Sequence, residues 1–382
     1  MSARKHIAIL ISSLGAGGAE RVIAMLARHW AGQGHQISII TFDRVTDPVY
    51  HALPQEVKLH RLGAKVGVGY RGNLKRLLAL RAELVKIEPD ILCSFLTKNN
   101  LLAALACLGR STPLIASERN NPERQATHPI WNLALKVAYR RANLIVCQTN
   151  AIKRCFPDAV QDRLVMIHNP ITGFDRNPEA AVAKKLCAVG RLTPQKGFPL
   201  LIEAFSRIAD KHPEWTLEIW GEGEIRRKLE AQVEQLGMEQ RILLPGVTEQ
   251  PGDWARDATI FVQSSLYEGF GNALGEALAS GLPVVATNCD FGPAEMIHDG
   301  YNGTLVENEN IAEIASAMSR LIDDRPLRDR YSIAAKEAAK KFDPALILSQ
   351  WDELIELVTG PPNVATMMGP PEPEFAAQNE PG

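Results

Sequence analysis

The feature of this sequence that most constrains its fold is a repeated alternation of short apolar runs with amphipathic stretches. The apolar runs are nearly uninterrupted, as in HIAILISSL at 6–14 and ATIFVQSS at 258–265. Strands that are buried on both faces have this composition, whereas the stretches between them have the spacing of helices. The alternation therefore predicts an α/β protein in which helices cover both faces of parallel sheets, the doubly wound arrangement.

The same alternation occurs twice, which predicts two domains. A chain of 382 residues is also longer than one hydrophobic core usually supports. We expect the first domain at 1–170 and the second at 185–342, joined by a linker at 171–184 that lacks strand character. A helix is expected at 343–360, and the segment 361–382, with its many prolines, is expected to be a disordered tail.

Composition excludes several classes of protein. No apolar stretch approaches the roughly 18 residues of a transmembrane helix, and the chain enters a strand pattern too early for a signal peptide. The six cysteines are isolated within apolar segments and form no C-x-x-C pair. This spacing predicts reduced core residues and neither disulfides nor a zinc site. We therefore expect a cytoplasmic protein.

The charges are distributed unevenly between the two halves. Residues 1–180 carry 24 Lys and Arg against 13 Asp and Glu, whereas residues 181–382 carry 18 against 31. A basic half predicts an anionic partner for the first domain. The alternative is that the two halves attract each other across a cleft. No nucleic-acid partner is expected.

The segment EGFGNALGE at 268–276 places a glycine-rich turn between a strand and a helix. The first turn of a helix carries unpaired N–H groups and a partial positive charge, which together can bind a diphosphate. Gly269 and Gly271 allow the backbone to approach such an anion closely. Glu268 is expected in the turn, and Glu276 on a helix face that can reach a ribose. The alternative is an ordinary loop followed by an exposed helical glutamate.

A second glycine-rich loop, GAGG at 15–18, also joins a strand to a helix. Alone it is weak evidence, since tight packing of a helix on a strand can require glycine. The dinucleotide-binding fingerprint G-x-G-x-x-G is interrupted by Glu20. Asp43 is the only acidic residue placed to bind a ribose after the second strand. An NAD-dependent oxidoreductase is therefore a poor alternative.

Four motifs together carry a resemblance to a known family: GAGGAERV at 15–22, VGRLTPQKG at 189–197, GEGE at 221–224 and EGFGNALGEALASGLPVVAT at 268–287. In this order they resemble the retaining GT-B glycosyltransferases of family 4, over nearly the whole chain. The stretches CSFLTKNN and ASERNNP resemble bacterial members that extend lipid-linked or surface-polysaccharide sugars. The resemblance implies two Rossmann-like domains that face each other across a cleft. The first would bind the acceptor and the second the nucleotide sugar, and a C-terminal helix would cross back to the first domain.

The resemblance also implies roles for particular residues. Arg191 and Lys196 match the family's cationic pair on the donor diphosphate, and Glu268 matches the residue beside the donor sugar. Glu276 matches the residue that accepts hydrogen bonds from the ribose. The other donor-binding positions come from the two glycine-rich loops and the loop beneath the base: Gly17, Gly18, Val247, Gly269, Phe270, Gly271 and Asn272.

One position departs from the family pattern. Relatives often carry a histidine near the reacting sugar where this chain has Arg119, which stays charged and cannot act as a general base. Arg119 is instead expected to hydrogen-bond the donor sugar or an acceptor phosphate, as a catalytic-site residue. His168 and His128 are alternatives, although a lone histidine beside a strand is more often structural. The implied mechanism is front-face substitution, in which the leaving phosphate takes the proton of the acceptor.

The reaction implied by the resemblance is transfer of a hexose from a nucleotide diphosphate sugar, with UDP as the expected nucleotide. The expected acceptor is a glycan or a polyprenyl-diphosphate-linked saccharide. No metal or other cofactor is expected, since no D-x-D motif ends a strand. A non-catalytic relative that binds a nucleotide sugar is the second candidate.

Two basic amphipathic segments, at 71–87 and 131–142, mix arginine and lysine with leucine and aromatic residues. Helices of this kind can lie on an anionic membrane. We therefore expect peripheral contact with the inner face of the cytoplasmic membrane. Ordinary surface helices with one apolar face would show the same pattern.

Overall fold

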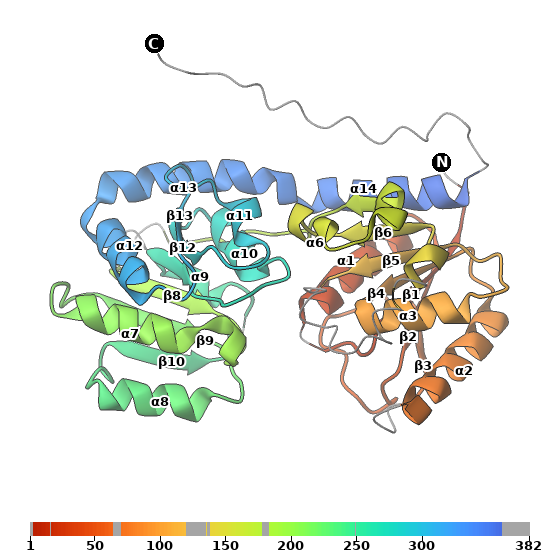
Figure 1. Ribbon diagram of the computed structural model, residues 1–382, viewed down its shortest axis with the longest axis horizontal. Helices are drawn as coiled ribbons and strands as arrows, with labels where there is room; N and C mark the ends of the chain where they lie inside the picture. The colour runs from red at the N-terminus through yellow and green to blue at the C-terminus, as the bar shows by residue number, and fades with distance from the viewer. Residues whose placement is uncertain are drawn as a thin grey trace, which may run out of the picture.

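The computed structural model describes residues 3–15, 17–63, 70–119, 135, 138–177, 183–248 and 250–360. These residues form two parallel sheets, each in its own lobe of an elongated molecule (Figure 1). The predicted α/β doubly wound fold is therefore confirmed. Three predictions concern residues outside the described ranges: the tail at 361–382, most of the basic segment at 131–142, and His128.

The first sheet has the strand order β3-β2-β1-β4-β5-β6-β7. Its strands are β1 (His6–Leu10), β2 (Gln36–Thr41), β3 (Lys58–Arg61), β4 (Ile91–Phe95), β5 (Leu114–Glu118), β6 (Leu144–Cys147) and β7 (Leu164–Met166). Strands β4 and β5 are buried over their whole length, in agreement with their apolar sequences. The edge strand β3 was not predicted, because KLHR is short, polar and partly exposed.

The second sheet has the order β10-β9-β8-β11-β12-β13. Its strands are β8 (Lys185–Val189), β9 (Thr216–Trp220), β10 (Ile242–Gly246), β11 (Ile260–Gln263), β12 (Val284–Thr287) and β13 (Thr304–Val306). In both sheets the carboxyl ends of the parallel strands meet at one edge, where ligands bind in folds of this kind.

Helices cover both faces of each sheet. In the first domain, α1 (Gly18–Gly32) lies on one face, and α2 (Tyr70–Ile87) and α3 (Thr97–Ala106) lie on the other. Shorter turns follow β6: α6 (Asn150–Arg154) and the 3-10 helix η1 (Asp158–Arg163). None of the described helices combines the length and the apolar composition needed to cross a membrane.

In the second domain, one face of the sheet is covered by α7 (Phe198–Ala209), α8 (Arg226–Gln235) and α12 (Ile311–Asp323). The other face carries α9 (Asp253–Arg256), α10 (Asn272–Ala279) and α11 (Pro293–Met296). Helix α13 (Arg325–Ala339) contributes side chains to both cores. Two 3-10 turns complete this part of the chain: η3 (Pro194–Lys196) and η4 (Lys340–Phe342).

The last described helix, α14 (Pro344–Thr359), returns to the first domain. It begins sharply because the Asp343 side chain accepts a hydrogen bond from Ala345 N at 2.8 Å, and Pro344 occupies the first helical position. Ile347, Trp351 and other residues of α14 are buried in the same core as α1 and β1. Figure 1 shows α13 over the second sheet and α14 continuing along the same side over the first. The predicted crossing back is therefore confirmed.

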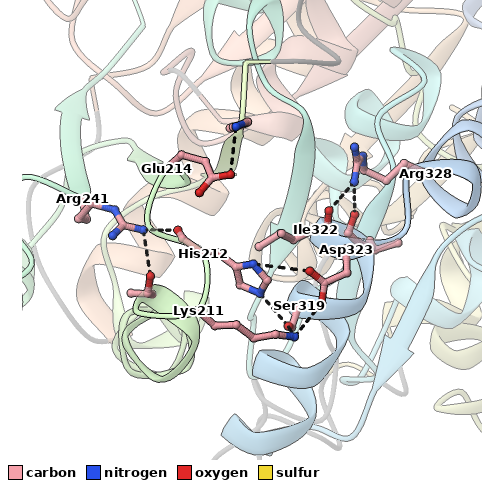
Figure 2. A network of polar contacts seen from close by, with 11 residues as sticks. Lys211, His212, Glu214, Arg241, Ser319, Ile322, Asp323 and Arg328 are labelled. Carbon is pink, nitrogen blue, oxygen red and sulfur yellow. Dashed lines mark hydrogen bonds and ion pairs between the residues drawn. The ribbon is translucent and has the colours of Figure 1, made fainter.

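A network of polar contacts lies at the amino ends of β9 and β10, far from the carboxyl ends of the strands (Figure 2). Lys211 Nζ donates to Asp323 Oδ2 at 2.8 Å, and the His212 ring lies 2.9 Å from Ser319 Oγ. Arg241 Nη2 donates to the carbonyl of His212 at 2.7 Å. The first two bonds join the turn after α7 to α12, and the third joins the same turn to the start of β10. We therefore assign this network a structural role.

Candidate active site

The predicted site residues lie at the carboxyl ends of strands in both sheets. The loop after β1 leads into α1, and the loops after β8 and β11 lead into η3 and α10. Two side-chain contacts join these ends across the domains. Asn169 Nδ2 donates to Asn272 Oδ1 at 2.6 Å, and Arg21 forms an ion pair with Glu276. The loops of the two domains therefore form one site.

Lys196 and Glu268 form an ion pair within the second domain. Lys196 Nζ donates to Glu268 Oε1 at 2.5 Å, and Ser265 Oγ donates to the same oxygen at 2.7 Å. Gly197, with φ of 61°, follows Lys196 and lies so close to the carbonyl of Ser264 that a Cβ atom would collide with it. This close approach requires glycine and holds η3 against the loop that carries Glu268.

The glycine-rich loop after β11 is held by backbone and aromatic contacts. Glu268 N donates to Asp290 O at 2.6 Å. The Phe270 side chain is buried, and its ring lies against His168 and Phe342, with centroid distances of 5.6 and 5.5 Å. Its side chain therefore belongs to the core, which leaves only its backbone for the predicted contact with the donor.

The remaining residues of this loop lead into α10. Gly269 is half-buried, and Gly271 has φ of 97°, a conformation that favours glycine. No side chain caps α10, so the first N–H groups of the helix have no partner within it. Asn272 reaches the first domain not only at Asn169 but also at Gly18, where a Cβ atom would lie 2.5 Å from Asn272 Nδ2. The starts of α1 and α10 are therefore in contact.

Glu276 lies one turn into α10, and its side chain is 10% exposed. Burial raises the pKa of its carboxyl group, and the charge and hydrogen bond of Arg21 oppose this shift. Arg21 comes from the first turn of α1, and its Nη1 donates to Glu276 Oε1. A guanidinium of the first domain thus pairs with the carboxylate that the family resemblance assigns to the ribose.

The loop after β1 brings another carboxylate to the site. Gly17 precedes α1, and the Glu20 carboxylate folds back into the space that a side chain on Gly17 would fill. Burial raises the pKa of Glu20, and the positive charge of Arg191 from the second domain lowers it. The charge of Arg191 therefore acts on Glu20, although the two residues belong to different domains.

Two cations of the site form ion pairs with carboxylates, Arg21 with Glu276 and Lys196 with Glu268. The positive charge of a third cation, Arg191, acts on the carboxylate of Glu20. Cationic side chains bind phosphate oxygens, and carboxylates accept hydrogen bonds from hydroxyl groups. A ligand that carries both a diphosphate and sugar hydroxyls offers partners to both kinds of group. Among the described residues, no group of three or more His, Cys, Asp or Glu is placed to hold a metal ion.

Arg119 follows β5 and is almost fully buried. Its Nε donates to Ser117 Oγ at 2.7 Å, and its Nη1 donates to Asn169 Oδ1. The guanidinium lies over the rings of Phe95 and Trp351, 5.2 and 5.7 Å from their centroids. Burial lowers the pKa of Arg119 to about 9, which leaves it charged at neutral pH. Its Nη2 is buried and has no hydrogen-bond partner among the described residues.

His168, the alternative to Arg119, lies in surroundings typical of a structural histidine. Its Nδ1 lies 2.7 Å from the carbonyl of Gln148, and its ring stacks on Phe270. Burial lowers the pKa of His168, which favours the neutral imidazole. These contacts fit a core histidine.

Val247 is exposed and lies on the rim of a cavity of about 700 Å³. The cavity lies against α9, whose Asp253, Trp254 and Arg256 line it, and Trp220 and Pro245 also line it. It includes none of the residues that pair across the cleft. The predicted contact of Val247 with the donor base therefore stays a prediction.

Three residues of this site were not predicted from the sequence: Glu20, Arg21 and Asn169. A usable signal exists for the first two, because GAGGAER places both charges in the first turn of a helix that follows a glycine-rich loop. Asn169 follows β7, and nothing in its local sequence distinguishes it from an ordinary loop asparagine.

Comparisons with known families cover most of the chain. Residues 16–172 match the model of a family described as Glycosyltransferase Family 4, and residues 174–338 match the model described as Glycosyl transferases group 1. The boundary between the two matches falls between the two sheets.

Individual proteins are similar over nearly the same range. The chain is 29% identical over 374 residues to the N-acetylgalactosamine-N,N'-diacetylbacillosaminyl-diphospho-undecaprenol 4-alpha-N-acetylgalactosaminyltransferase of Campylobacter jejuni, covering 90% of this chain and 97% of that protein. It is 28% identical over 343 residues to an uncharacterized glycosyltransferase of Methanocaldococcus jannaschii, covering 74% and 83%. The crystal structure of Anabaena HepE in complex with UDP and glucose has the same fold, with a TM-score of 0.77 and 22% identity, covering 92% of this chain and 100% of HepE.

Proposed function

Since the chain belongs to the GT-B glycosyltransferases, with a family 4 domain followed by a group 1 domain, we propose that it transfers a hexose from a UDP-sugar to a glycan or lipid-linked saccharide, with retention of configuration. The observation that most supports this donor is the pair of ion pairs, Arg21 with Glu276 and Lys196 with Glu268, at the carboxyl ends of both sheets. A nucleotide diphosphate sugar offers phosphates to the cations and hydroxyls to the carboxylates.

Four side chains of the site and the start of α10 have roles in this proposal. Arg191 and Lys196 hold the diphosphate, together with the uncapped first turn of α10. Glu276 accepts hydrogen bonds from the ribose, and Glu268 accepts them from the donor sugar. The cationic pair stabilises the charge that develops on the diphosphate as the anomeric bond breaks.

The proposed reaction takes place on one face of the sugar. The bond between the anomeric carbon and the diphosphate oxygen breaks, and the acceptor oxygen forms a bond to the same carbon from the same side. The acceptor proton passes to the leaving diphosphate oxygen, so no protein base is needed. We propose that the cationic side chains supply the positive charge and that transfer requires no metal ion.

A thermal-shift measurement tests the donor. Ligands at about 100 times their dissociation constant stabilise a protein by about 2.7 kcal/mol, which is readily visible as a higher unfolding midpoint. We expect UDP to raise the midpoint of the wild type more than GDP, ADP or NAD do. The shift should be reduced in Arg191→Ala and Lys196→Ala but retained in Lys228→Ala, which removes an exposed lysine of α8.

The other outcomes of this measurement contradict parts of the proposal. Stabilisation by GDP or ADP alone would contradict uracil as the base of the donor and would identify guanine or adenine instead. Stabilisation by NAD alone would contradict the proposed donor class. UDP binding without turnover of any UDP-sugar would favour a non-catalytic sensor.

The proposed acceptor is a lipid-linked or surface glycan of bacteria. The name of the Campylobacter jejuni relative describes transfer to a saccharide on diphospho-undecaprenol. An acceptor of this kind would be held at a membrane surface, and the first domain carries the excess of positive charge.

One helix of the first domain has the surface that such a location requires. On α2, the side chains of Leu74, Leu78 and Val85 are 55, 59 and 54% exposed, at helical spacing. Lys75 and Lys86 are exposed on the same helix. We propose that this face lies on an anionic bilayer, with the apolar side chains in the interface and the lysines at lipid head groups.

We expect the wild-type protein to co-sediment with vesicles containing anionic lipid at low salt, and Lys75→Gln/Lys86→Gln to bind about fivefold more weakly for each lysine removed. Leu78→Ser should weaken binding further, because it removes a side chain from the interface. The matched control is Ile333→Ser, since Ile333 is 74% exposed on α13 of the other domain. Equal binding to neutral vesicles, or equal losses in the control, would contradict this proposal.

A further inference from the structure

Among the site residues that the structure describes, Arg21 is the one cation that pairs with the other domain by a direct hydrogen bond. It lies in the first turn of α1, and it pairs with Glu276 in α10 of the other domain. The Arg21 side chain is 29% exposed, whereas that of Glu276 is 10% exposed. Glu276 is thus nearly enclosed, and Arg21 occupies one of its two carboxylate oxygens.

The position of Arg21 is electrostatically unfavourable unless it has an anionic partner. The amino terminus of a helix carries a partial positive charge, so an arginine in the first turn is repelled by its own helix. Glu276 supplies the compensating negative charge in the structure. If hydroxyl groups of a ribose take up the hydrogen-bonding positions on Glu276, Arg21 needs another anion.

A diphosphate would lie within the surroundings of Arg21. The first residue of α1, Gly18, is in contact with Asn272, the first residue of α10. The first turn of α10 is where the proposed function places the diphosphate. The positive charge of Arg191 acts on Glu20 in the same turn of α1 as Arg21. The guanidinium of Arg21 lies at the end of a long side chain that is partly exposed, so it is not enclosed.

We propose that Arg21 exchanges partners when the donor binds: it pairs with Glu276 beforehand and with the donor diphosphate once the ribose takes Glu276. This inference rests on the proposed function, because it needs a ligand with both a ribose and a diphosphate. Arg21 then opposes binding of a nucleoside, which can only compete for Glu276, and favours binding of a nucleoside diphosphate.

The test compares uridine with UDP by isothermal titration of the full chain. In Arg21→Gln we expect uridine to bind about fivefold more tightly, because the competitor for Glu276 is gone, and UDP to bind about fivefold more weakly, because a phosphate partner is lost. Arg28→Gln removes an exposed charge from the same helix and should change neither affinity. A general loss of positive charge would not change the affinities for uridine and UDP in opposite directions.

A second variant separates the exchange from a change in folding. In a Glu276→Gln background, Arg21→Gln should no longer tighten uridine binding, since the pair no longer exists. Equal shifts of uridine and UDP in the same direction, or no shift of either, would overturn the exchange while the wild type still binds UDP. Failure of the wild type to bind UDP would overturn the proposed donor and the exchange together.

Discussion

Replacement of Lys196 by alanine is expected to lower kcat by about 10² to 10³-fold, because one preorganised charge that stabilises the leaving diphosphate is removed. The loss should appear in kcat more than in KM if Lys196 acts mainly as the anomeric bond breaks. The measurement is steady-state release of UDP from a UDP-sugar with a glycan acceptor.

The structure adds a second reason for a large effect. Lys196 is the cation paired with Glu268, which is 5% exposed. Without the ammonium group, this carboxylate retains Ser265 as a hydrogen-bond donor but loses its neighbouring positive charge. Glu268 would then lack the ion pair that holds its carboxylate in place beside the donor sugar. The two residues should therefore act as a unit.

A double-mutant cycle tests that coupling. Glu268→Gln and Lys196→Ala together should cost clearly less than the product of the separate losses. Lys228→Ala should have wild-type kinetics, and excess chelator should leave the wild-type rate unchanged. If the losses in kcat of the two single variants multiply in the double variant, the coupling is contradicted. A Lys196→Ala enzyme with wild-type kcat would contradict the role of the lysine. Loss of the wild-type rate with chelator would contradict metal-free transfer.

The fold could be predicted from the sequence because most of its strands are buried on both faces. Runs such as ILCSF in β4 have no other plausible location in a protein of this composition. β3 shows the limit of this argument. KLHR is held at the sheet edge by backbone pairing with β2, and its side chains carry little apolar signal.

The site was predictable only where one local motif carries the chemistry. The turn and helix with Glu268 and Glu276 have a recognisable order of residues. Pairing between domains has no such signal, since Arg21 and Glu276 are far apart in the sequence and meet only after both domains have folded. The same reason explains why the buried position of Arg119, under an aromatic ring of α14, could not be foreseen.

Replacement of Trp351 by alanine is expected to destabilise the first domain by about 3 to 5 kcal/mol, the usual cost of deleting a buried aromatic side chain. Trp351 is fully buried in α14. Its ring stacks on Phe95, with centroids 5.6 Å apart, and meets the edge of Trp30 at 6.3 Å. Since these contacts fasten the crossing helix to the sheet, a cavity at this point should also loosen α14.

A matched substitution distinguishes packing from hydrogen bonding. Trp351 Nε1 has no hydrogen-bond partner among the described residues, so Trp351→Phe keeps an aromatic ring against Phe95 and removes an unsatisfied donor. It should therefore cost much less than Trp351→Ala in urea denaturation followed by circular dichroism. Leu357→Ala, at a half-exposed position of the same helix, controls for changes in α14 itself. If Trp351→Ala unfolds at the same urea concentration as Leu357→Ala, then α14 is not fastened to the first domain through this ring.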